Sequence, residues 1–305
     1  MANLEVTFCG KKFKNPVIAA SGTFGFGREY AEVYDISELG GIATKGITPE
    51  RREGNPPPRI AETYGGILNS VGLQNPGVRE FLDKELGFLK SRDTVVIVNI
   101  AGSTESEYCE MARLISRSQA DMVELNISCP NVKQGGVTFG SKPESVERIT
   151  RLVKGSLESQ MPLIVKLSPN VASISEAALA AQEGGADALS LINTITGMAV
   201  DAGTRRPILA NITGGLSGPC IKPIALRMVY EAYRAVKIPI IGMGGIMTAE
   251  DAVEFMLCGA SLVQVGTANL VRLDACRQII EGLREFCIQN GIENISELTG
   301  SLITD

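Results

Sequence analysis

The chain has 305 residues, enough for one large domain or two, and its 44% hydrophobic and 21% charged residues are ordinary for a folded protein. A formal net charge of -5 and a pI of about 5.2 argue against a nucleic-acid-binding protein, which usually carries a basic face. No apolar run reaches the roughly 18 residues of a membrane-spanning helix, and the first residues lack a signal-peptide core, so we expect a cytoplasmic protein with no membrane partner.

Short apolar runs rich in β-branched residues recur along the chain, with helix-length segments between most of them. These runs occupy residues 16–21, 41–47, 95–102, 122–128, 162–168, 188–194, 238–245 and 262–268. Such runs are typical of strands that are buried on both faces. We therefore predict an α/β fold, a (β/α)8 TIM barrel that forms a single domain over residues 1–305. The alternative, an open doubly wound sheet, lacks the expected GxGxxG motif after its first strand.

Two long insertions exceed what a minimal barrel needs. They follow the second and sixth predicted strands, at residues 48–78 and 197–222. Long loops in a compact domain are usually functional, so we expect lids or binding walls.

Glycine-rich loops follow the seventh and eighth predicted strands, with the sequences GMGGI (242–246) and GTANL (266–270). In a TIM barrel a phosphate group is often held at these two loops, which predicts a phosphate site here. The alternative is that the glycines only form tight turns.

Polar residues end the first six predicted strands. They are Ser21, Lys45, Asn99, Asn126 with Ser128, Lys166 with Ser168, and Asn193 with Thr194. A single strand-end Asn or Ser is more often a cap, but lysine is rarely buried without an anionic partner. Glu124 could serve as that partner from across the barrel. Together these side chains predict a mouth that binds a planar, anionic, hydrogen-bonding ligand.

The chain has seven cysteines and no histidine, which removes the histidine-dependent nucleophilic triads. No cysteine spacing suits zinc or an iron–sulfur cluster, so we expect reduced thiols and no metal site. Cys129 differs from the rest because Pro130 follows it and a glycine-rich loop comes next, which favours a functional thiol at the barrel mouth. We expect the others to be small buried hydrophobic residues, namely Cys9, Cys109, Cys220, Cys258, Cys276 and Cys287.

NISCPNVKQGG, around Cys129, is one of several motifs that resemble the class 1 dihydroorotate dehydrogenases. The others are SGTFGFG (21–27), ATKGIT (43–48), LNSVGLQNPG (68–77), VKLSPN (165–170), INT (192–194), GGLSG (214–218), GMGG (242–245) and GTA (266–268). The similarity runs from about residue 5 to residue 270, and the motif around the cysteine is more similar to the NAD-linked class 1B catalytic subunit than to the fumarate-linked class 1A enzyme.

The resemblance implies oxidation of dihydroorotate to orotate in pyrimidine biosynthesis, with FMN in the barrel mouth. Cys129 would remove a proton while the flavin accepts a hydride. The implied substrate-binding residues are Lys45, Asn69, Gly72, Leu73, Asn126, Asn193 and Thr194. The implied FMN-binding residues are Ser21, Lys45, Gly46, Asn99, Asn126, Lys166, Ile192, Gly218, Gly244, Gly245, Gly266 and Thr267.

The resemblance also implies that electrons leave through a partner subunit that carries FAD and an iron–sulfur cluster and delivers them to NAD. The expected assembly is a homodimer core within a heterotetramer. Two alternatives remain open: a homodimeric class 1A enzyme that reduces fumarate, and a flavin-free phosphate-binding lyase or isomerase with a Schiff-base lysine at Lys45 or Lys166.

Overall fold

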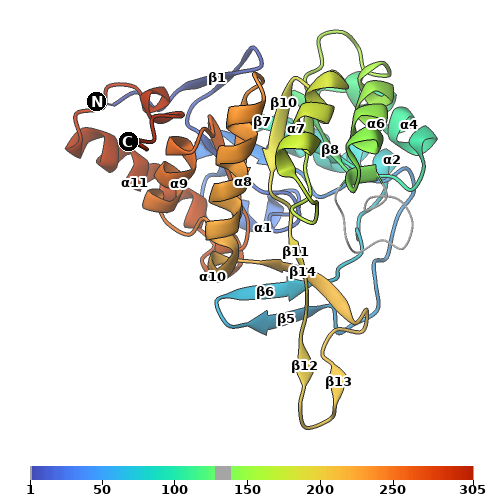
Figure 1. The fold of residues 1–305 in the computed structure, drawn as a ribbon. Coiled ribbons are helices and arrows are strands. Elements are labelled where there is room, and N and C mark those ends of the chain that lie inside the picture. The colour runs from blue at the N-terminus through green and yellow to red at the C-terminus, as the bar shows by residue number, and fades with distance from the viewer. Residues whose placement is uncertain (1, 128–138, 305) are drawn as a thin grey trace.

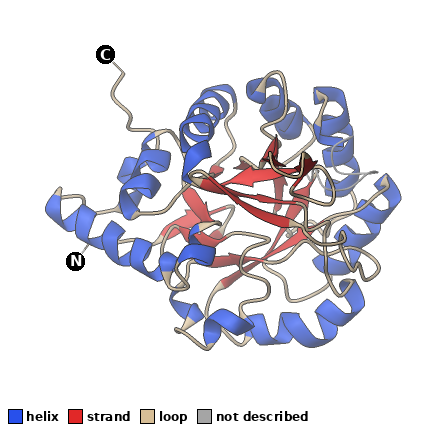
Figure 2. Ribbon diagram, turned by 90° about the horizontal axis from the view of Figure 1, so that it is seen from below, coloured by secondary structure: helices blue, strands red, loops and turns tan. Residues whose placement is uncertain are grey.

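The computed structural model describes residues 2–127 and 139–304. A closed barrel of parallel strands lies at its centre, in the order β10-β15-β16-β3-β4-β7-β8-β9. Figure 2 shows these strands enclosed by a ring of helices. The strands are β3 (Val17–Ala19), β4 (Gly41–Ala43), β7 (Val95–Ile100), β8 (Met122–Asn126), β9 (Leu163–Lys166), β10 (Ala188–Leu191), β15 (Ile240–Met243) and β16 (Leu262–Val265). The predicted TIM barrel is confirmed, and each strand lies within one of the predicted apolar runs.

The longer helices cover the outside of the barrel (Figure 1), and all of them except the last, which follows the final barrel strand, connect successive barrel strands. They are α4 (Glu105–Ser116), α6 (Pro143–Lys154), α7 (Ile174–Glu183), α8 (Lys222–Ala235), α9 (Ala249–Leu257) and α11 (Ala275–Gln289). The short helical segments are α1 (Arg28–Ala31), η1 (Ile36–Glu38), α2 (Val78–Glu80), η2 (Phe81–Glu85), α3 (Leu86–Lys90), η3 (Pro219–Ile221), α10 (Ala268–Val271) and η4 (Ile295–Leu298). None of the helices within the described residues combines the length and the apolar character that crossing a membrane requires.

Helix α9 shows how local sequence fixes where a crossover begins. The Thr248 side chain accepts a hydrogen bond from the backbone of Asp251, and the Asp251 carboxylate accepts one from the backbone of Thr248, which completes a capping box. Asp251 also lies 2.6 Å from the Lys222 ammonium at the start of α8. Burial raises the pKa of Asp251, but hydrogen bonds from Lys222 and from backbone amides outweigh burial and lower it overall. The cap therefore also links two neighbouring helices.

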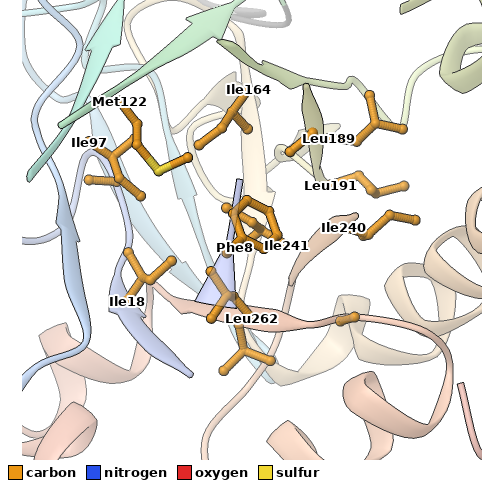
Figure 3. Packing of buried hydrophobic residues seen from close by; sticks show 14 of the residues in the cluster. Phe8, Ile18, Ile97, Met122, Ile164, Leu189, Leu191, Ile240, Ile241 and Leu262 are labelled. Carbon is orange, nitrogen blue, oxygen red and sulfur yellow. The ribbon is translucent and has the colours of Figure 1, made fainter. Parts of the chain in front are cut away.

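The barrel interior changes from apolar to polar along the strands. Figure 3 shows Phe8 among Ile18, Met122, Ile164 and Leu262, which lie in the first halves of their strands. Phe8 belongs to the antiparallel hairpin of β1 (Val6–Phe8) and β2 (Lys11–Phe13) near the start of the chain. Successive inward positions on a strand are two residues apart, so polar Glu124, Lys166 and Gln264 follow Met122, Ile164 and Leu262 toward the carboxyl ends.

The two insertions meet in a second sheet beside the carboxyl ends of the barrel strands (Figure 1). Its strands have the order β11-β14-β6-β5, with β5 (Ile60–Thr63) and β6 (Gly66–Asn69) from the first insertion. The strand β11 (Ile195–Met198) leads into the second insertion and β14 (Thr213–Ser217) lies within it, and β12 (Val200–Asp201) and β13 (Arg206–Pro207) project from it as a hairpin. The register places Asn69 opposite Gly215, so residues far apart in sequence form one wall.

Candidate functional site

A cavity of about 260 Å³ lies at the carboxyl ends of the barrel strands, against the insertion sheet. Most of the site residues expected from the sequence line it. They are Ser21, Lys45, Gly46, Asn69, Gly72, Leu73, Asn126, Lys166, Ile192, Asn193, Thr194, Gly244, Gly245, Gly266 and Thr267. The structure thus brings together side chains from the barrel and from both insertions. The roles expected for these residues remain predictions.

Two expected site residues within the described part of the chain are not in the cavity lining. Asn99 is fully buried, and its Oδ1 accepts a hydrogen bond from Nδ2 of Asn126, 3.2 Å away. Gly218 is buried and is not among the lining residues, whereas the neighbouring Ser217 lines the cavity. Cys129 lies outside the described residues. A contact between the flavin and Asn99 or Gly218 therefore stays a prediction.

Glu124 is the centre of a buried polar layer inside the barrel. Its Oε1 accepts hydrogen bonds from Ser190 Oγ and Gln264 Nε2, each at 2.8 Å, and its Oε2 accepts one from Asn99 Nδ2 at 2.5 Å. The Lys166 Nζ lies 3.7 Å from Oε2. Four strands besides β8 contribute to this layer, so one carboxylate fixes the orientation of side chains around the barrel.

Glu124 was expected to be the partner of Lys166, but from across the barrel. The structure corrects this, because β8 and β9 are adjacent strands and pair in parallel. Lys166 is 5% exposed and Glu124 is 0% exposed, so both charges are removed from water and each depends on the other. Lys45 is only half-buried and lines the cavity.

Gln264 lines the cavity but was not predicted from the sequence. It is 1% exposed, lies in β16 and lines the cavity floor together with Lys166. Its Nε2 is bound to Glu124, whereas its Oε1 is buried and accepts no hydrogen bond from any of the described residues. The available signal was a single polar residue in the apolar run LVQV, at the second-to-last position of the strand.

The loop after β15 has a backbone that only glycine adopts easily. Gly244 and Gly245 have φ values of +128° and +85°. A Cβ on Gly245 would lie 2.7 Å from the carbonyl oxygen of Gly218, and a Cβ on Gly244 would lie 2.7 Å from Cβ of Ala225. The chain therefore passes too close to its neighbours for a side chain at either position, and both glycines line the cavity.

The opposite wall carries amides and a hydroxyl. Asn69 Nδ2 donates to the carbonyl of Gly215 at 3.3 Å, which fixes its side chain against β14. Thr194 lies beside the same glycine, because a Cβ on Gly215 would come within 2.0 Å of Thr194 Oγ1. Asn193 Oδ1 accepts a hydrogen bond from the backbone of Thr194 at 2.7 Å. These groups can hydrogen-bond a polar ring or a carboxylate in the cavity.

The cysteines within the described residues differ in exposure. Cys109, Cys276 and Cys287 are buried, as expected, whereas Cys9 and Cys258 are half-buried. Cys220 is exposed, so the expectation of a buried residue was wrong for it; it lies in the middle of η3, the short turn before α8. Burial raises the pKa of the Cys276 thiol to about 12. Burial and the nearby Asp187 carboxylate raise the pKa of Cys9 to about 12, against a smaller opposite effect of Lys154.

Comparison with known proteins identifies the family. The family model described as dihydroorotate dehydrogenase matches residues 3–287. A protein of Caldicellulosiruptor saccharolyticus is 55% identical over 98% of this chain and 99% of its own length, and one of Alkaliphilus metalliredigens is 56% identical over the same shares. A protein of Thermoanaerobacter pseudethanolicus is 55% identical over 99% of this chain and 100% of its own length. All three are named dihydroorotate dehydrogenase B (NAD(+)), catalytic subunit. The chain belongs to the dihydroorotate dehydrogenase family.

Proposed function

We propose that this chain is the catalytic subunit of an NAD-linked dihydroorotate dehydrogenase and oxidises dihydroorotate to orotate in pyrimidine biosynthesis. The observation that carries the proposal is identity of about 55% over essentially the whole chain to proteins that bear this name. The cavity agrees with it, because TIM-barrel enzymes bind substrates at the carboxyl ends of the barrel strands, where this cavity lies. We also propose that residues 1–305 form one FMN-binding domain in the cytoplasm.

The described residues fit FMN at two places. Gly244, Gly245, Gly266 and Thr267 all line the cavity, and their backbone amides would bind the phosphate group. At the cavity floor, the Lys166 ammonium would lie near the pyrimidine edge of the flavin ring. A cation there stabilises negative charge on the ring, which favours hydride acceptance. FMN, when bound, supplies the hydride acceptor.

The remaining polar groups would position the substrate against that ring. Asn69, Asn126, Asn193 and Thr194 would hydrogen-bond the carboxylate and ring amides of dihydroorotate, and Lys45 would reach both ligands. Such fixed donors and acceptors hold the reacting carbons in one orientation, and this lowers the entropic part of the barrier.

Cys129 would be the catalytic base. Its thiolate would take a proton from one ring carbon while hydride leaves the adjacent carbon, so that a C=C bond forms and two C–H bonds break. A thiol has a reference pKa of about 8.5, nearer to neutrality than that of serine or lysine, and suits this role.

The electrons must then leave the flavin, and we propose that a second polypeptide receives them. The name "catalytic subunit" that the relatives carry supports a separate partner chain. We expect the partner to hold FAD and an iron–sulfur cluster, to deliver electrons to NAD, and to assemble around a homodimer of this chain as a heterotetramer. The isolated chain should therefore reduce fumarate poorly, and rapid fumarate turnover without a partner would instead indicate a class 1A enzyme.

Absorbance spectroscopy tests the proposal. The purified chain, loaded with FMN and kept free of oxygen, should lose the visible band of oxidised flavin when dihydroorotate is added. A chain that does not bind FMN at all would support the flavin-free alternative. Bound FMN that dihydroorotate cannot bleach would contradict the proposed substrate.

A further inference from the structure

We infer that Gln264 is a ligand contact of the cavity: its Oε1 accepts a hydrogen bond from the N–H of a cyclic imide, and Glu124 fixes the amide in that orientation. The inference rests on the proposed function and adds a residue to its site. An imide edge, in which an N–H lies between two carbonyl groups, occurs in the pyrimidine ring of a flavin and in orotate. The contact could therefore come from either molecule.

The position of Gln264 makes its free oxygen unusual. The residue is 1% exposed and lines the cavity, and its Oε1 is buried without a hydrogen-bond partner among the described residues. A buried acceptor without a partner destabilises the folded protein, because its hydrogen bonds to water are lost on burial and no other hydrogen bond replaces them. A donor on a bound ligand would remove that cost.

The orientation of the amide follows from Glu124. The Gln264 Nε2 donates to Glu124 Oε1 at 2.8 Å, and Ser190 Oγ donates to the same oxygen at the same distance. An ionised carboxylate only accepts hydrogen bonds, so a flipped amide would place two acceptors against each other. Glu124 therefore keeps the nitrogen of Gln264 toward itself, and Oε1 is the end left for a ligand.

The same carboxylate also places a donor nearby. The Lys166 Nζ lies 3.7 Å from Glu124 Oε2, and Lys166 lines the cavity as well. Glu124 thus holds an ammonium donor and an amide acceptor at the cavity floor. This pair matches the alternating carbonyl and N–H groups of an imide edge, and Glu124 acts as a positioning residue for both.

Affinity measurements on the FMN-free protein test the contact. FMN binding is followed by quenching of flavin fluorescence, and orotate binding by a spectral shift of the FMN-loaded protein. Gln264→Met removes the acceptor at similar size and should weaken one ligand about tenfold, the usual effect of an unmade buried hydrogen bond. Weaker FMN binding would assign the contact to the flavin, and weaker orotate binding alone would assign it to the substrate ring.

Two comparisons distinguish the loss of this hydrogen bond from a general change in side-chain packing. Ser190→Ala also removes a hydrogen bond to Glu124 but leaves Gln264 in place, so it should change both affinities much less. In the unaltered protein, FMN or orotate methylated at the imide nitrogen should bind about tenfold more weakly than its parent, and Gln264→Met should reduce that difference. If Gln264→Met does not fold, the affinities of the unaltered protein for the methylated ligands still test whether the imide N–H is bound.

Unchanged affinity of Gln264→Met for both ligands would overturn the inference, as would equal binding of methylated and parent ligands by the unaltered protein. These outcomes differ from failure of the proposed function, in which the unaltered protein would bind no FMN.

Discussion

Glu124 and Lys166 face each other inside the barrel, with Oε2 of the carboxylate 3.7 Å from Nζ of the ammonium. They lie on adjacent strands, and Lys166 lines the cavity while Glu124 lies beneath it. The Lys166 ammonium, which would lie near the flavin, is therefore held in place by the Glu124 carboxylate, which does not line the cavity.

Removal of Lys166 alone should destabilise the protein. Lys166→Met leaves the buried Glu124 carboxylate without its counter-charge, so we expect the free energy of unfolding to fall by roughly 3 kcal/mol. In the double variant Lys166→Met/Glu124→Gln neither charge remains, so it should be more stable than Lys166→Met alone. Denaturant unfolding of both variants, of Glu124→Gln and of the unaltered protein gives the free energies of unfolding for a double-mutant cycle. Strictly additive effects would show that the two charges are not coupled.

The thiol of Cys129 should set the pH dependence of the reductive step. Because the thiolate is the reactive form, flavin reduction should slow as the pH falls below the pKa of the thiol and level off above it. Cys129→Ser should lose at least about a hundredfold in rate near neutral pH, since a hydroxyl is a much weaker base. Stopped-flow absorbance under anaerobic conditions measures both.

Cys258→Ser is the matched control, because Cys258 follows the end of α9 and does not line the cavity. It should keep the rate and pH profile of the unaltered protein. An unchanged rate in Cys129→Ser would remove this residue from the proposed mechanism.

The loop after β15 should not tolerate a side chain. Gly245→Ala keeps the backbone amide but places a Cβ 2.7 Å from the Gly218 carbonyl oxygen, so the loop must shift. We expect FMN affinity to fall more than about tenfold, a loss worth at least about 1.4 kcal/mol. Titration of the FMN-free protein with FMN measures it.

Gly10→Ala controls for backbone strain, since Gly10 has a φ of +76° but open space around it and lies in the hairpin between β1 and β2. It should lower stability without changing FMN affinity. Equal affinities of Gly245→Ala and the unaltered protein would argue against a phosphate site at this loop.

The barrel strands could be predicted because strands buried on both faces are visible as continuous apolar runs, such as VVIVNI in β7. The insertion sheet could not. Its strands are short and partly exposed, and Asn69 pairs with Gly215 across a long stretch of sequence. Such pairing depends on tertiary contacts that local pattern does not carry.

Within the site, residues at strand ends could be predicted because carboxyl ends of barrel strands converge on one mouth. Gln264 was missed because it lies inside its strand, where one polar residue gives little signal until its neighbours around the barrel are known. Glu124 was recognised as a partner for Lys166, but only the strand order shows that the two are adjacent. The exposure of Cys220 likewise depends on how the turn before α8 packs.

The described cysteines should react with an alkylating reagent at very different rates. Cys220 is exposed and should be modified first. Burial and nearby charge raise the pKa of Cys9 to about 12, and burial alone does so for Cys276, so both should remain protonated and unreactive near neutral pH. Peptide mapping by mass spectrometry after timed labelling follows each site. Labelling of Cys9 as fast as Cys220 at neutral pH would contradict this.

A crystal structure of the chain with FMN and orotate bound tests the central claim most directly. We expect the FMN phosphate at Gly244, Gly245 and Gly266, the flavin ring above Lys166, and orotate between that ring and the sulfur of Cys129. Orotate or FMN bound elsewhere, or a Cys129 sulfur remote from the substrate ring, would contradict the account.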